Sequence, residues 1–81
     1  MAQVKQMGAN DWWCEWRNHE ANFHKDETGN WRGDMIAYGE WGDMDREEAG
    51  AVAYAFGIVD ELPRNSQWAL DYYFGGRKVL A

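Results

Sequence analysis

The sequence predicts a mainly α fold, with α+β as the alternative class. Three observations predict it. The chain has 81 residues, which is enough for one compact domain and no more. Aromatic residues recur at helical spacing in its first third, and an acidic segment followed by a long apolar run marks a second helix. The expected domain has about three helices, at roughly 11–25, 44–60 and 66–74.

The first expected helix, residues 11–25, rests on an aromatic stripe. Four side chains fall at i, i+4, i+7 and i+11: Trp12, Trp16, His19 and Phe23. This spacing is typical of one face of a helix, and Asn10 or Asp11 can cap its start. Residues 1–9 are expected to be a flexible N-terminus, so that the compact domain covers residues 10–81.

The segment around 29–42 is expected to be a short β-hairpin or irregular. Gly33, Gly39 and Gly42 fall within ten residues, and such a density of glycine weakens a helix. Trp31, Met35 and Tyr38 could nevertheless form a helical stripe. The choice between helix and strand for residues 34–42 stays open at this point.

The second helix, 44–60, is predicted to be the most buried element. Its acidic start, DMDREE, suits a helix N-terminus, and the run AGAVAYAFGIV that follows is apolar on every side. The helix can end at Gly57 or continue to Leu62, just before Pro63. Ala49, Ala53 and Gly57 would form a groove of small residues on it.

The third helix, 66–74, lies between clear start and stop signals. Asn65 or Ser66 can cap its N-terminus, and Gly75 and Gly76 end it. Trp68 and Tyr72, four residues apart, supply part of its apolar surface.

Composition excludes several classes of protein. The chain has 14 acidic and 8 basic residues, a net charge of -6, and 16% aromatic residues. A disordered acidic tail would be poor in aromatics, and eight scattered basic groups cannot neutralise many phosphates. A single cysteine, Cys14, excludes an internal disulfide framework. Residues 1–7 lack the apolar run of a signal peptide, and the longest apolar stretch, Ala49 to Val59, is too short to span a membrane, so a cytoplasmic location is expected.

No motif predicts a metal or a cofactor. Cys14, His19 and His24 are spaced so that they would point in different directions on a helix. The alternating acids that begin at Asp43 resemble the start of a calcium loop. The pattern fails because its sixth position holds Glu48 instead of Gly, and its twelfth holds Tyr54 instead of Glu.

Catalysis is also not expected. The candidate nucleophiles are Cys14, Thr28 and Ser66, and none has a base placed by its spacing together with a group that would orient that base. The sequence therefore predicts a protein that is not an enzyme.

The charge distribution is the strongest functional indication. Between Asp26 and Glu61 there are ten acidic residues and two arginines, so this segment has a net charge of -8. Aromatic residues interleave with the acids, and such a surface can attract a basic groove on another protein. The predicted partner-binding residues are Trp31, Asp34, Tyr38, Glu40, Trp41, Asp43, Asp45, Glu47 and Glu48.

In size and charge the chain resembles the small acidic proteins that bacteriophages use against host enzymes, including anti-CRISPR and DNA-mimic inhibitors. The resemblance is one of composition, and no motif carries it. It implies an inhibitor whose partner is a protein with a basic, nucleic-acid-binding surface. The alternative is a homodimer or a subunit of a larger assembly, in which the surplus aromatics are buried against another chain.

Overall fold

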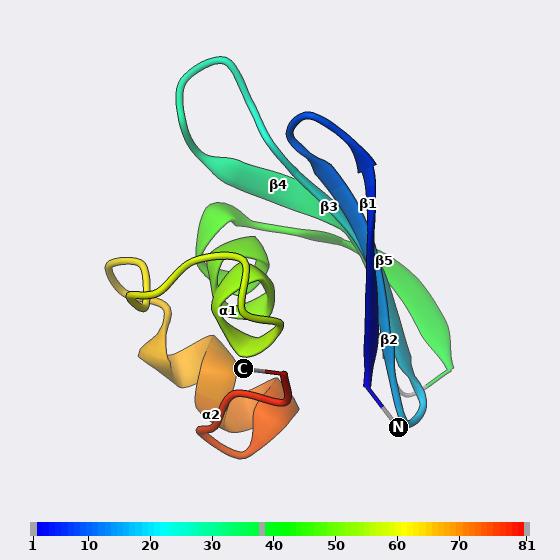
Figure 1. Cartoon of the computed structure of the whole chain (residues 1–81). Helices are drawn as coiled ribbons and strands as arrows, with labels where there is room; N and C mark the ends of the chain where they lie inside the picture. The colour runs from blue at the N-terminus through cyan, green and yellow to red at the C-terminus, as the bar shows by residue number, and fades with distance from the viewer. Residues whose placement is uncertain (1, 38, 81) are drawn as a thin grey trace.

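The computed structural model describes residues 2–37 and 39–80, and it shows an antiparallel sheet followed by two short helices (Figure 1). The elements are β1 (Gln3–Gly8), β2 (Asp11–Trp16), β3 (His19–Lys25), β4 (Trp31–Ala37), β5 (Glu40–Met44), α1 (Arg46–Ala55) and α2 (Gln67–Phe74). Strands account for 40% and helices for 23% of the structure. The fold is therefore mainly β, and the prediction of a mainly α fold is wrong.

The sheet is a meander in which each strand pairs with the next along the chain, in the order β1-β2-β3-β4-β5. Both helices lie on one side of it (Figure 1). Helix α1 contacts β3, β4 and β5, and α2 packs against α1. The opposite face of the sheet carries no helix, and β1 and β5 form its two edges.

Residues 11–25 form the β2–β3 hairpin instead of the predicted helix. Trp16 pairs with His19 across a two-residue turn, in which Arg17 has a φ of 54°. Alternate residues of β2 and β3 face the helices, and the turn brings Trp12 opposite Phe23, with ring centroids 5.9 Å apart. Trp12, Trp16, His19 and Phe23 thus lie on one face of the sheet. They do so because side chains alternate along each strand, and not because they form a helical stripe.

The core lies between the sheet and the helices. Phe23, Val52 and Leu70 are completely or almost completely buried. Ala49 and Ala53 of α1 have no exposed surface, so their small side chains allow close packing within this chain. The predicted groove of small residues on this helix is therefore not open to another molecule. The prediction that this helix would be the most buried element is confirmed.

Both helices are bounded by capping interactions. Asp45 is the N-cap of α1, and its side chain accepts a hydrogen bond from the Glu48 backbone N–H. At the other end, Gly57 has a φ of 75° and the Ile58 N–H donates to the Ala53 carbonyl, which closes a Schellman motif. The helix is thus shorter than the predicted 44–60 and ends at the earlier of the two predicted stops.

Helix α2 matches its predicted range. Ser66 occupies its N-cap position, and Gly75 ends it in the left-handed conformation with a φ of 67°. The Gly76 N–H donates to the Leu70 carbonyl and completes the C-terminal cap.

Two further sequence expectations concern the N-terminal half. Residues 3–8 form β1, which pairs with β2 along its length, so this part of the expected flexible segment 1–9 belongs to the sheet. The segment around 29–42 was expected to be a hairpin or irregular, and Trp31–Ala37 and Glu40–Met44 form the β4–β5 hairpin. The hairpin interpretation is confirmed.

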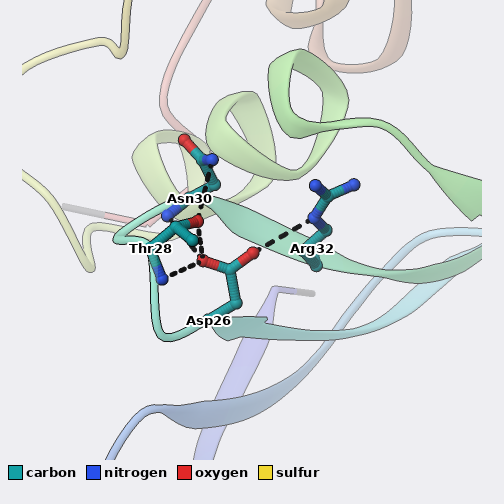
Figure 2. A network of polar contacts seen from close by, with 4 residues as sticks. All are labelled: Asp26, Thr28, Asn30 and Arg32. Carbon is teal, nitrogen blue, oxygen red and sulfur yellow. Dashed lines mark hydrogen bonds and ion pairs between the residues drawn. The ribbon is translucent and has the colours of Figure 1, made fainter.

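The loop between β3 and β4 is organised by one carboxylate. Asp26 accepts hydrogen bonds from the Thr28 and Asn30 backbone N–H groups and from the Thr28 hydroxyl, and it forms an ion pair of 3.2 Å with Arg32 (Figure 2). These donors, led by the Thr28 hydroxyl, hold the pKa of Asp26 well below its usual range. The loop is thus fixed by four groups that converge on one side chain.

Candidate functional site: an acidic-aromatic groove

A groove of about 210 Å³ lies where the edge strand β5 meets both helices. Its lining comes from β4, β5, α1 and α2. We call it the acidic-aromatic groove, and its residues are Met35, Ala37, Glu40, Trp41, Gly42, Asp43, Met44, Glu48, Tyr72 and Tyr73.

The groove is negatively charged. Glu40 and Glu48 contribute carboxylates, and the described residues that line it include no Lys, Arg or His. Asp43 also lines the groove, but its carboxyl bonds to Asp34 on the open face of the sheet. Glu47 lies in the first turn of α1 beside Glu48, and its carboxylate accepts a hydrogen bond of 2.7 Å from the Trp68 indole N–H. A further acidic group, on α1, therefore lies next to the groove.

Large apolar side chains are exposed in the same place. Trp41 is 53% exposed, Trp68 47% and Tyr72 61%. They are three of the four large hydrophobic side chains that are exposed in the described part of the chain, and the fourth is Met7 on β1, at the opposite edge of the sheet. Since isolated exposed apolar residues need no explanation but clustered ones do, this concentration marks an interaction surface.

Glu48 lines the groove and connects its two helices. One of its carboxylate oxygens accepts a hydrogen bond from the Asp45 backbone N–H, which completes a capping box at the start of α1. The other accepts a bond of 2.7 Å from the Tyr73 hydroxyl. One side chain thus links the helix start to α2 and fixes the two walls relative to each other.

The structure brings together several of the residues that the sequence predicted for partner binding. Glu40, Trp41, Asp43 and Glu48 line one groove, and Glu47 lies beside it. They come from β5 and from the first turn of α1, which follow each other directly in the chain. The short connection between strand and helix is what places these acids side by side.

Asp34 lies outside the groove. It pairs with Asp43 across β4 and β5, with its side chain on the face of the sheet that no helix covers. A hydrogen bond with the Asp43 carboxyl, together with burial and charge repulsion from the same group, raises the pKa of Asp34. Asp43 therefore connects the groove to a second acidic position on the open sheet face.

Two other predicted residues do not contribute an open binding group, and a third is not described by the structure. Trp31 is only 7% exposed and packs against Trp12 and Phe23, so it is part of the core. Asp45 caps α1 through its side chain. Tyr38 lies outside the described residues.

Sequence reasoning missed the contribution of α2. The sequence predicts Trp68 and Tyr72 only as part of the apolar surface of the third helix, and the structure exposes both, at the groove or beside it. A signal existed in the residue types. Of the apolar side chains in QWALDYYF, Ala69, Leu70 and Phe74 are the buried ones, and the i, i+4 pair Trp68 and Tyr72 is left on another face.

The structure offers little for metal or thiol chemistry. Among residues 2–37 and 39–80, no three His, Cys, Asp or Glu side chains converge in a way that could hold a metal ion. Cys14 is buried, and burial raises the pKa of its thiol to about 12. Burial also lowers the pKa of His19. Within the same residues, no helix has the length and apolar character needed to cross a membrane.

The chain was compared with family models, with curated proteins and with solved structures, and none of these comparisons gave a match.

Proposed function

We propose that the chain is a small protein-binding module that docks its acidic-aromatic groove on a basic surface of a partner protein. The partner's surface is one that otherwise binds nucleic acid, so docking inhibits the partner. The observation that carries this proposal is that exposed Trp41 and Tyr72 line a groove whose described lining residues include acids and no bases. Exposed Trp68 lies one turn before Tyr72 and bonds to Glu47.

The chemistry of the groove suits lysine and arginine side chains. A carboxylate pairs with a guanidinium or ammonium group through charge-assisted hydrogen bonds, and an aromatic face attracts the same cations through its quadrupole. Aromatic residues also supply most of the binding energy at protein interfaces, since they bury large areas at little cost in side-chain entropy. The acids would set the rate and orientation of docking, and the aromatics its strength.

Inhibition follows from competition for the same basic groups. A nucleic-acid-binding groove presents Lys and Arg to phosphates, and carboxylates that reach those cations prevent phosphates from doing so. The extra acid at Asp34, joined to the groove through Asp43, extends the negative surface onto the open sheet face.

A cross-linking experiment tests the proposal. A photoreactive amino acid at position 41 would capture the partner in cell extract, and the binding of the purified partner would then be measured with unmodified protein. Trp41→Ala and Tyr72→Ala are expected to weaken binding by roughly tenfold or more each, which corresponds to hot-spot residues. Met7→Ala is the matched control, because Met7 is equally exposed but lies on the opposite edge strand.

Two results would contradict the proposal. One is a partner whose binding is unaffected by Trp41→Ala and Tyr72→Ala, since the groove would then not be the interface. The other is cross-linking of position 41 to a second copy of the chain, with light scattering showing a stable dimer. If a partner binds through the groove and keeps its affinity for nucleic acid, docking is supported and inhibition is not.

A further inference from the structure

A second pocket, of about 430 Å³, lies on the side of α1 that faces the β3–β4 loop. Its walls are that loop, the first residue of α1 and the segment between the two helices. We call it the arginine pocket, and its lining residues are Gly29, Asn30, Trp31, Arg46, Pro63, Arg64 and Asn65.

The charge of this pocket is opposite to that of the chain. Arg46 and Arg64 line it, and none of its described lining residues is acidic, although the chain as a whole has a net charge of -6. Most other cations have partners: Arg32 pairs with Asp26, and Arg17, Lys25 and Lys78 lie over aromatic rings. Among the described residues, Arg46 and Arg64 have no ion pair, no side-chain hydrogen bond and no ring contact. Two of the four Lys and Arg residues without such a partner among the described residues thus share one pocket.

Three carboxylates that lie close in the chain to the lining residues are engaged elsewhere. Asp26 is bound by Arg32 and by the Thr28 and Asn30 donors of its own loop (Figure 2). In the first turn of α1, Glu47 accepts from Trp68, and Glu48 accepts from Tyr73 and from a backbone N–H. These acids therefore have donors of their own and do not line the pocket beside Arg46.

We propose that the arginine pocket binds a phosphate group carried by a small molecule. Two guanidinium groups from separate parts of the chain can each donate two parallel hydrogen bonds to a phosphate, and the Asn65 amide adds a further donor. The volume falls in the range of small-molecule sites and exceeds what a bare phosphate fills. The Pro63 side chain offers apolar contact to the rest of the ligand.

A second pocket rich in cations provides a contrast. It is lined by Arg17, Arg77 and Lys78, at the turn between β2 and β3. There Arg17 lies 4.8 Å from the centre of the Trp16 ring, and Lys78 lies 4.7 Å from that of Tyr54. Two of its three cations are thus already held by aromatic faces. Arg77, which lines this pocket and not the arginine pocket, is the site for a control substitution.

The experiment is a titration followed by NMR, with phenyl phosphate as the probe and phenol as the matched compound without phosphate. Phenyl phosphate is expected to shift the Trp31 indole N–H and the Gly29 and Asn65 amides in a saturable manner. Phenol, and sodium chloride at the same ionic strength, are expected to leave them unshifted. Arg46→Gln and Arg64→Gln should each weaken binding by about tenfold, because each removes a charged donor, whereas Arg77→Gln should leave it unchanged.

Several outcomes overturn the proposal: no saturable shift, an equal shift with phenol or with chloride, or binding that Arg77→Gln weakens while Arg46→Gln and Arg64→Gln do not. The amide spectra of the two variants show directly whether they are folded. If both were unfolded, Arg46→Lys and Arg64→Lys would replace them, and these are expected to bind more weakly because they lose the two-pronged geometry.

Discussion

The Tyr73 hydroxyl donates a hydrogen bond of 2.7 Å to Glu48, whose other carboxylate oxygen accepts from the Asp45 backbone N–H at the start of α1. One carboxylate thus holds the N-terminus of α1 and the middle of α2 in a fixed relation. The acidic-aromatic groove lies directly over this connection. Its shape therefore depends on Glu48, independently of any charge that Glu48 offers to a partner.

Removal of this side chain should cost stability. Glu48→Ala loses half of the capping box and the Tyr73 bond, and we expect the free energy of unfolding to fall by about 1–2 kcal/mol. Glu48→Gln keeps an oxygen acceptor for one bond and should recover part of the loss. Urea denaturation followed by tryptophan fluorescence measures both. Equal stability of Glu48→Ala and the unaltered protein would contradict the role assigned to this contact.

The Asp34–Asp43 pair predicts a pH dependence. The pKa of Asp34 is raised above its ordinary value of 3.8 by the hydrogen bond with Asp43. The folded state thus binds this proton more tightly than the unfolded state. The contribution of the pair to stability is fully present below pH 3.8 and is lost as the pH rises through the raised pKa.

Asp43→Asn tests this dependence. An asparagine can donate to the Asp34 carboxylate, so the pKa of Asp34 should fall and the variant should gain stability relative to the unaltered protein at neutral pH. A carbon-detected NMR titration of the Asp34 carboxyl gives its pKa, and unfolding curves at pH 3 and pH 7 give the stability at each pH. Asp60→Asn removes another exposed acid and serves as control. An Asp34 titration that Asp43→Asn leaves unmoved would exclude the pairing.

Gly33 is predicted to be intolerant of any side chain. A Cβ atom built there would lie 2.0 Å from the Asn22 carbonyl oxygen of the neighbouring strand β3, and the residue has a φ of +154°. Gly33→Ala must push β3 and β4 apart, and we expect a loss of about 1–3 kcal/mol. Gly42→Ala in β5 is the matched control, because a Cβ there meets no atom within 4 Å. Thermal unfolding compares the stability of the two variants. Similar midpoints would contradict the close approach of Gly33 to the Asn22 carbonyl.

Charge reversal in the groove should act on the rate of partner binding. Glu40 is exposed, lines the groove and has no side-chain hydrogen bond among the described residues, so Glu40→Lys should leave the fold intact. We expect the association rate constant to fall by about three- to tenfold at low salt, with a smaller effect at high salt. Stopped-flow measurements at two salt concentrations test it, with Glu61→Lys as the control. An effect confined to dissociation would argue against steering by the groove.

The second half of the fold was predictable because its signals are local. Its signals are the acidic start of α1, the glycines after both helices and the position of Ser66. Each of them acts on backbone groups only a few residues away. The first half was not, because the β2–β3 hairpin contains no glycine at its turn. Arg17 and Asn18 make that turn, and they shift the alternation so that Trp12, Trp16, His19 and Phe23 mimic a helical stripe.

The site was predictable in part for the same reason. Glu40, Trp41, Asp43 and Glu48 lie close in sequence, and the short passage from β5 to α1 keeps them close in space. Trp31 was predicted to bind a partner, and it is buried in the core. An aromatic residue beside charged neighbours has the same sequence pattern whether it faces the core or the solvent. Trp68 and Tyr72 were missed as groove residues because only the packing of α2 against α1 brings them to the acids.

The order of the strands has a consequence for how the chain folds. Every sheet pairing joins elements adjacent in the chain, so each hairpin can close a short loop without waiting for a distant segment. Such local connectivity favours rapid folding, with hairpins forming in microseconds. We expect the helices to dock after the sheet has formed, since both follow it in the chain, α1 packs on the sheet and α2 packs on α1. During synthesis, the strands would therefore leave the ribosome before the two helices that complete the groove.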